Sequence, residues 1–115
     1  MKRLLIANRG EIAARISRTA QAMGIKTVAV FSDSDRNSWH RKLTDESVHI
    51  GKSAPKESYL AMERILQAAI DTNCDFIHPG YGFLSENIDF IRLVEEVSLI
   101  RIKWASLGQI KAVCL

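Results

Sequence analysis

The segment 78–87 holds the residue types in this sequence that are best suited to binding a ligand. Gly80 and Gly82 flank Tyr81, and a short apolar run comes just before them. Glycine lets the backbone take positive φ and approach another group closely, while Tyr81 offers one flat apolar face and one hydroxyl. Because open α/β sheets bind ligands at the carboxyl ends of their strands, the segment predicts a binding loop at that edge. An ordinary tight connection between a strand and a helix is the alternative.

A second polar turn, residues 8–11, follows the apolar run at the start of the chain. Dinucleotide folds carry a glycine-rich fingerprint at this place, but the turn has one glycine, and Arg9 and Glu11 would crowd a pyrophosphate. The turn therefore disfavours classical dinucleotide binding. Since charges that are buried need partners, we expect Arg9 and Glu11 to pair with neighbouring loops and, with Asn8, to support the 78–87 loop.

The remaining acids and histidines do not form a catalytic or metal-binding pattern. Asp33 and Asp35 follow the second apolar run, where an acid holds a ribose in dinucleotide folds. Because the glycine-rich fingerprint is missing, we interpret these two residues as turn-forming. The three histidines are separated in the sequence, and the two cysteines lack metal or redox spacing. His78 precedes a proline and is therefore held extended. We expect it to pack and to form hydrogen bonds.

Apolar runs and amphipathic stretches alternate along the chain. Continuous apolar or β-branched runs are typical of strands buried on both faces, and they predict strands at 3–7, 26–31, 47–50, 76–78 and 99–102. Apolar residues at helical spacing predict helices at 11–23, 59–72 and 88–96, with shorter ones at 38–43 and 108–115. Gly24 is placed to end the first helix, and Ser58 and Asn87 are placed to cap two later ones.

The short joints between these elements favour right-handed crossovers and a parallel sheet. The prediction is one α/β domain, Rossmann-like, with helices on both faces of its sheet. The net charge of +3 is small and the basic residues are scattered, apart from a cluster at 36–42 that we interpret as a solvated loop. No apolar run approaches the ~20 residues that cross a bilayer, and residues 1–3 leave no space for a leader. We expect a cytoplasmic protein that binds neither nucleic acid nor membrane.

Two of these segments, taken together, resemble a known family. Residues 6–13 (IANRGEIA) and 78–87 (HPGYGFLSEN) are similar to the N-terminal domain of the biotin carboxylases, which is the first domain of an ATP-grasp enzyme. Residues 24–30, 33–36 and 58–60 also fall where that family has them, so the resemblance runs from Arg3 to about Glu96. Within the family, residues 35–38 and 58–63 look most like the 3-methylcrotonyl- or propionyl-CoA carboxylase type.

The resemblance implies an ATP-dependent ligase in which MgATP activates bicarbonate and the carboxyl group passes to N1 of carrier-bound biotin. Biotin, ATP and Mg²⁺ are then cofactors of the complete enzyme. Its partners would be the remaining carboxylase domains, a biotin carrier domain and a second copy in a homodimer. The ATP-binding lysines, metal-binding carboxylates and catalytic arginine of the family lie in later domains. We therefore expect no catalytic or metal-binding residue in this chain, no tight cofactor binding and no activity of the chain alone.

The resemblance also assigns roles to particular residues. The Gly80, Tyr81 and Gly82 loop would line the active site where the ureido ring of biotin and bicarbonate meet. Asn8, Arg9, Glu11 and His78 would support that loop. Arg15 and Arg18, on the outer face of the first helix, correspond to the region that relatives use for dimerisation, with a solvated helix face as the alternative.

The resemblance ends after Glu96. Relatives have glycine where Ser98 stands and a Gly-Pro pair in place of Lys103 and Trp104, so we expect a domain at 1–103 and a divergent tail at 104–115. A truncated, rearranged or degenerate gene product would explain this, as would an artificial boundary. Two other functions remain open. One is a non-catalytic module that docks on a full-length carboxylase subunit, and the other is a stand-alone nucleotide-binding protein.

Overall fold

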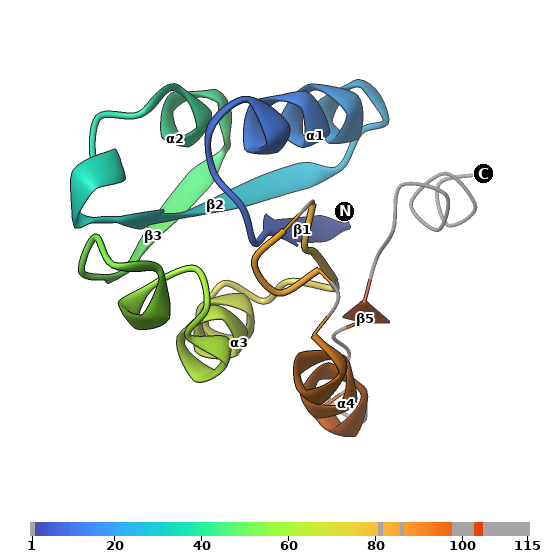
Figure 1. Cartoon of the computed structure of the whole chain (residues 1–115). Coiled ribbons are helices and arrows are strands. Elements are labelled where there is room, and N and C mark those ends of the chain that lie inside the picture. The colour runs from blue at the N-terminus through green and yellow to red at the C-terminus, as the bar shows by residue number, and fades with distance from the viewer. Residues whose placement is uncertain (1, 81, 86, 98–102, 105–115) are drawn as a thin grey trace.

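A computed structural model describes residues 2–80, 82–85, 87–97 and 103–104 of the chain (Figure 1). Strands and helices alternate along these residues, as the sequence predicts. The elements are β1 (Arg3–Ile6), α1 (Gly10–Ala22), β2 (Lys26–Ser32), α2 (Trp39–Leu43), β3 (Glu46–Gly51), α3 (Met62–Asp71), β4 (Phe76–His78), α4 (Ile88–Val97) and β5 (Lys103–Trp104). Short 3-10 turns at Asp33–Asp35 and Pro55–Glu57 follow β2 and β3.

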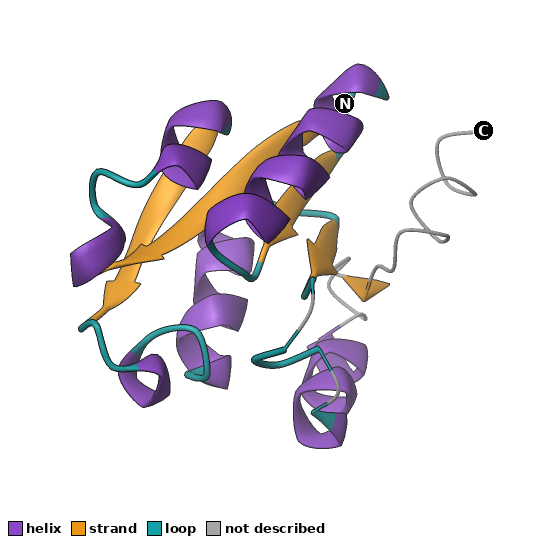
Figure 2. Cartoon of the chain, turned by 45° about the horizontal axis from the view of Figure 1, so that its top comes forward, coloured by secondary structure: helices purple, strands orange, loops and turns teal. Residues whose placement is uncertain are grey.

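The five strands form one parallel sheet in the order β3-β2-β1-β4-β5. α1 and α2 cover one face of the sheet, and α3 and α4 cover the other (Figures 1 and 2). Side chains of β1 alternate between the two faces, so Leu4 and Ile6 pack with α1 while Leu5 packs with α3. The predicted α/β fold with helices on both faces is confirmed.

α1 lies within one residue of the helix predicted at 11–23, and it ends where its sequence predicts. Its buried residues, Ala13, Ala14, Ile16, Ser17 and Ala20, recur at helical spacing. Gly24 takes a φ of +79° and donates its N–H to the Gln21 carbonyl oxygen at 3.0 Å, while the Ile25 N–H reaches the Ala20 carbonyl oxygen at 2.9 Å. These two bonds form a Schellman motif, which confirms Gly24 as the residue that ends the helix.

The start of α3 differs from the prediction. The sequence predicts a helix from Tyr59 capped by Ser58, but α3 begins at Met62 and its N-cap position is Ala61. The Ser58 hydroxyl instead donates to the Ala54 carbonyl oxygen at 3.1 Å. The physical reason is a tertiary contact: the Tyr59 side chain is 2% exposed, and its hydroxyl donates to Asp35 across the top of the sheet.

The cap of α4 agrees with the prediction, whereas the strand β5 includes Lys103 and Trp104, which the sequence places after the strand predicted at 99–102. The Phe90 N–H donates to Asn87 Oδ1 at 3.0 Å, so Asn87 caps α4 as expected. The predicted strand at 99–102 and helix at 108–115 lie outside the described residues, and β5 is found at Lys103–Trp104. Among the helices that the structure describes, none has the length and apolar character needed to cross a membrane.

Candidate functional site

The turn after β1 and the loop after β4 meet at one edge of the sheet. Ile6 pairs with His78 at the carboxyl ends of the two strands. Just beyond that pair, the Ala7 N–H donates to the His78 carbonyl oxygen at 2.8 Å. The Asn8 side chain, 1% exposed, then donates from Nδ2 to the Pro79 carbonyl oxygen at 2.9 Å. A buried hydrogen bond from Asn8 therefore fixes the first residues of the loop.

Gly80 occupies a position that only glycine fits. Its φ is +66°, and a Cβ placed there would lie 2.8 Å from Asn8 Nδ2 and 2.9 Å from Ile12 Cγ2. Its N–H donates to Nδ1 of His78 at 3.0 Å. The backbone conformation and the close approach of Asn8 and Ile12 thus both require the absence of a side chain.

The next described residues of the loop continue in the left-handed region. Gly82 has a φ of +66° and open space around it, and Phe83 has a φ of +44°. The Phe83 ring stacks on Tyr59, with ring centroids 5.1 Å apart and an interplanar angle of 26°. The Ser85 N–H donates to the Gly82 carbonyl oxygen at 2.9 Å, and Leu84 is 1% exposed. Gly82 is therefore an open position that directly precedes the packed residues Phe83 and Leu84.

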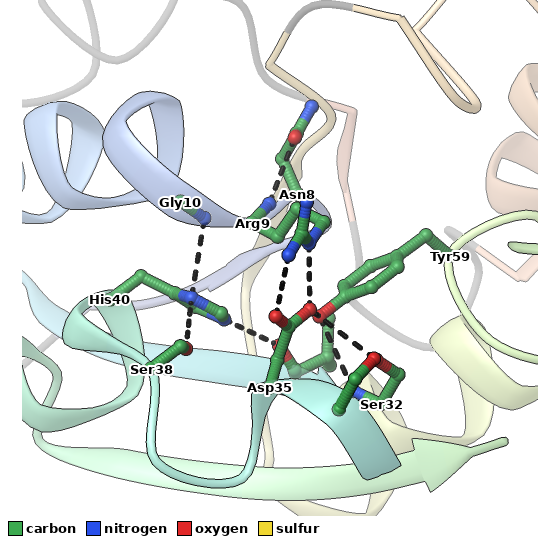
Figure 3. Close-up of polar contacts among 10 residues, drawn as sticks. Asn8, Arg9, Gly10, Ser32, Asp35, Ser38, His40 and Tyr59 are labelled. Carbon is green, nitrogen blue, oxygen red and sulfur yellow. Dashed lines mark hydrogen bonds and ion pairs between the residues drawn. The ribbon is translucent and has the colours of Figure 1, made fainter. Parts of the chain in front are cut away.

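Asp35 lies at the centre of a polar network beside this loop (Figure 3). Arg9 donates to it from Nε at 2.7 Å and from Nη2 at 2.6 Å. The Tyr59 hydroxyl donates to Asp35 Oδ2 at 2.6 Å, and the Ser32 hydroxyl does so at 3.3 Å. The carboxylate, which is 4% exposed, is thereby bound by three side chains from three segments of the chain.

These contacts change the proton affinities of the groups involved. Hydrogen bonds from Arg9, and then from Tyr59, lower the pKa of Asp35 to about 2, although burial opposes the shift. Burial, and then the contact with Asp35, raises the pKa of Tyr59 to about 12. The Asp35 carboxylate also raises the pKa of Arg9 above its usual range. Asp35 is therefore ionised and Tyr59 protonated near neutral pH.

His40 is buried beneath the start of α1. Its Nδ1 accepts hydrogen bonds from the Ser38 hydroxyl at 2.7 Å and from the Gly10 N–H at 3.2 Å. Because Nδ1 accepts, the proton is on Nε2, which donates to the Val30 carbonyl oxygen at 3.0 Å. Burial lowers the pKa of His40, so a neutral imidazole joins α1, α2 and β2.

His78 also has a neutral imidazole. Burial lowers its pKa, and its Nδ1 accepts the Gly80 N–H, so its proton is on Nε2. Nε2 is buried and has no hydrogen-bond partner within the part of the chain that the structure describes. The free lone pair that a general base needs is already used by Gly80. His78 thus packs and forms a hydrogen bond within the loop, as expected for a single histidine at a strand end.

Other residues singled out in the sequence lie further from the loop. Glu11 is exposed and pairs with Arg18 at 3.6 Å on the outer face of α1, so the expectation that it pairs with a neighbouring loop is wrong. Its side chain points outward because its helical position is off the buried stripe. Arg15 is also exposed. Asp33 is in the 3-10 turn, as predicted, and lies 2.6 Å from His49 Nε2.

Tyr81, whose ring and hydroxyl are the side-chain groups of the loop best suited to contact a ligand, lies outside the described residues. Within the described residues, no group of three His, Cys, Asp or Glu side chains is arranged to hold a metal ion. Cys74 is buried and free, and burial raises the pKa of its thiol to about 11. The described part of the site therefore offers backbone groups at an open glycine rather than a nucleophile or a metal centre.

The role of Tyr59 was not predicted from the sequence. Its apolar neighbours at helical spacing placed it inside a helix, whereas the structure places its ring between Phe83 and Asp35. The one signal in the sequence was the segment 58–60, which resembles the family in order but gives no information on the contacts of Tyr59.

Comparison with known proteins gives a consistent family. The family model described as "Biotin carboxylase, N-terminal domain" matches residues 1–103. The methylcrotonoyl-CoA carboxylase subunit alpha of Mus musculus is 52% identical over 98 residues, which are 85% of this chain and 14% of that protein. The propionyl-CoA carboxylase alpha chain of Caenorhabditis elegans is 57% identical over 94 residues, 82% of this chain and 13% of that one.

A bacterial relative and two solved structures extend the comparison. Biotin carboxylase 1 of Bacillus subtilis (strain 168) is 52% identical over 99 residues, 86% of this chain and 22% of the relative. The biotin carboxylase domain of a thermophilic 2-oxoglutarate carboxylase, bound to bicarbonate, has a TM-score of 0.82 and 44% identity, covering 90% of this chain and 22% of that one. The urea carboxylase of Kluyveromyces lactis has a TM-score of 0.83 and 47% identity, and the match covers 90% of this chain and 9% of the urea carboxylase chain. The chain thus spans a quarter or less of each relative.

Proposed function

Because this chain belongs to the family of biotin carboxylase N-terminal domains, we propose that it serves as the first domain of an ATP-dependent biotin carboxylase. The complete enzyme would carboxylate carrier-bound biotin with bicarbonate and MgATP. The observation that carries the proposal is the loop after β4: it leaves the sheet at its ligand-binding edge, and Gly80 is fixed there by Asn8. The family match over residues 1–103 supports this reaction for the complete enzyme.

The same loop carries the proposed contact with substrate. Gly80, Tyr81 and Gly82 would line the side of the active site where biotin and bicarbonate meet. The open space around Gly82 supports this assignment, because a flat ring can approach a backbone that has no side chain. Asn8, Arg9 and His78 would support the loop, and their hydrogen bonds to Pro79, Asp35 and Gly80 favour that role.

The described residues do not fit MgATP. Mg²⁺ takes carboxylate and phosphate oxygens, and no cluster of acids suited to a metal is found in the described ranges. The turn at the start of α1, where a nucleotide fold would bind phosphate, directs Arg9 to Asp35 and the Gly10 N–H to His40. We therefore propose that ATP and Mg²⁺ are held by other domains and that this chain alone binds neither tightly.

We also propose the partners of this domain. They are the remaining carboxylase domains, a biotin carrier domain and a second copy of the enzyme. Arg15 and Arg18 on the outer face of α1 are exposed, as a dimer contact requires of the free domain. The cytoplasmic location stays a prediction, and so does the division into a domain at 1–103 and a tail at 104–115.

Grafting the domain into a complete enzyme tests the proposal. Residues 1–103 would replace the matching region of Biotin carboxylase 1 of Bacillus subtilis, which is 52% identical. We expect the graft to carboxylate free biotin with bicarbonate and MgATP, and the isolated chain to show no turnover. A graft that folds by circular dichroism but lacks activity would contradict the proposal. Co-sedimentation of the isolated chain with the intact Bacillus enzyme would then favour a docking module.

A further inference from the structure

We propose that Tyr59 is a positioning residue that sets the conformation of the loop at Gly82 and Phe83. The inference rests on the proposed function, since it explains how the loop that would meet biotin is held ready. Tyr59 reaches the loop from outside it, from the segment just before α3. Its ring stacks on Phe83, and its hydroxyl donates to Asp35.

The stacking contact matters because Phe83 takes an unfavourable backbone conformation. Its φ of +44° lies in the left-handed region, which residues with a Cβ avoid unless their surroundings hold them there. Tyr59 supplies a stacking partner, with centroids 5.1 Å apart and an interplanar angle of 26°, a separation within the range that aromatic pairs favour. Tyr59 is 2% exposed, so the ring that holds Phe83 is itself fixed by the core.

The hydroxyl of Tyr59 fixes the ring at its other end. It donates to Asp35 Oδ2 at 2.6 Å and accepts the Ser32 N–H at 3.2 Å. Asp35 is in turn held by Arg9 through two hydrogen bonds. The ring therefore has little freedom to turn or slide, and Phe83 stacks on a surface whose position is set by the end of β2.

The contacts of Asn8 and Tyr59 hold the loop on both sides of the open position at Gly82. Asn8 holds the loop at Pro79 and Gly80, while Tyr59 holds it at Phe83. Arg9, next to Asn8 in the chain, joins Tyr59 through Asp35 (Figure 3). Gly82 lies between the two anchors in the sequence, and its carbonyl oxygen accepts the Ser85 N–H at 2.9 Å, so its backbone is held without the help of a side chain. A preorganised backbone of this kind lowers the entropic cost of binding a ligand.

Three variants of the isolated chain test whether Tyr59 positions the loop. Tyr59→Phe removes the hydroxyl alone, and Phe83→Leu removes the stacked ring from the loop. Ile16→Val is the control, because it removes one methylene from the core on the opposite face of the sheet. The readout is hydrogen exchange of the Ser85 N–H, which donates to the Gly82 carbonyl oxygen.

We expect Tyr59→Phe and Phe83→Leu to speed the exchange of the Ser85 amide by about tenfold, because the local opening of the loop becomes easier. Ile16→Val should leave the exchange rate of the Ser85 amide unchanged, with the Gly24 amide at the end of α1 as the internal reference. An unchanged Ser85 rate in Tyr59→Phe would overturn the link through Asp35. An unchanged rate in both variants would overturn the positioning role altogether.

A second measurement links the loop to substrate in the grafted carboxylase. There, Tyr59→Phe should raise KM for biotin by about fivefold and leave KM for ATP unchanged, because the loop contributes to orientation of one substrate only. Equal changes in both KM values, or none, would overturn the role in biotin binding. If the wild-type graft is inactive, the proposed function fails, while the exchange of the Ser85 amide still decides whether Tyr59 positions the loop.

Discussion

Arg9 and Asp35 form a two-pronged ion pair, with Nε 2.7 Å from Oδ2 and Nη2 2.6 Å from Oδ1. The carboxylate is buried, whereas half of the Arg9 side chain is exposed. This pair joins the N-cap residue of α1 to the turn that follows β2. It leaves Asp35 Oδ2 to accept the Tyr59 hydroxyl as well, so one carboxylate joins three segments at the carboxyl end of the sheet.

Replacing Asp35 by alanine should destabilise the domain. The change leaves the buried Tyr59 hydroxyl without its acceptor, and unpaired buried polar groups are costly. We expect the free energy of unfolding to fall by about 2 kcal/mol. The loss of the ion pair adds little to this value, because Arg9 reaches solvent. Urea unfolding of Asp35→Ala measures it. Asp33→Ala, two residues away and exposed, is the matched control and should cost less than about 0.5 kcal/mol.

Acid should destabilise the fold through its buried histidines. Burial lowers the pKa of His40 and of His78 in the folded state. A group whose folded pKa lies below its unfolded value contributes stability above the unfolded pKa, and that stability is lost as pH falls through the folded pKa. The free energy of unfolding should therefore decrease from about pH 7 to about pH 5. In His40→Gln the decrease should be smaller, whereas an equal slope would contradict the assignment.

A second acid-induced loss should follow at lower pH. The pKa of Asp35 is lowered from 3.8 to about 2 by its hydrogen bonds with Arg9 and Tyr59. The stability that this carboxylate contributes is present above its unfolded pKa and is lost as pH falls through the folded value. Unfolding followed by circular dichroism between about pH 4 and about pH 2 should show this loss, and Asp35→Asn should abolish that part of the pH dependence.

Alanine variants of three glycines with a left-handed φ distinguish the cost of backbone strain from the cost of a steric clash. Gly24→Ala and Gly82→Ala meet nothing within 4 Å, so each should cost about 1 kcal/mol. Gly80→Ala would bring a Cβ to 2.8 Å from Asn8 Nδ2, and we expect a cost of about 3 kcal/mol, measured by urea unfolding. In the grafted enzyme, Gly82→Ala should lower biotin carboxylation while Gly24→Ala leaves it intact. Equal activity of these two variants would exclude the Gly82 backbone from the active site.

Charge reversal on α1 tests the proposed dimer contact. Arg15 and Arg18 are exposed, and the Glu11–Arg18 pair at 3.6 Å is a surface ion pair of the kind that contributes less than about 1 kcal/mol. Replacing both arginines by glutamate should change the free energy of unfolding of the isolated chain by less than about 1 kcal/mol. In the graft, the same replacement should weaken dimerisation, as measured by sedimentation. Lys56→Glu, on an exposed turn, is the control. A dimer that persists would favour a solvated helix face.

The sequence predicted the elements better than the contacts between them. Apolar spacing located β1, α1 and β4, and Gly24 and Asn87 marked helix ends, because such features depend on neighbours in the chain. The position of Tyr59 could not be found this way, since its burial depends on a carboxylate 24 positions earlier. Glu11 shows the converse: its charge suggested a partner in a neighbouring loop, but its position on the outer face of α1 directs it to Arg18.

The place of β1 in the sheet has a consequence for how the domain is made. β1 is paired on one side with β2 and on the other with β4, which follows much later in the chain. During translation, β1, β2 and β3 can assemble while the opposite edge of β1 is still open. An open edge of Leu and Ile residues invites pairing with other nascent chains. The hydrogen bond from Asn8 to Pro79, across 71 positions, can form only after β4 has left the ribosome, so completion of the loop after β4 coincides with closure of that edge.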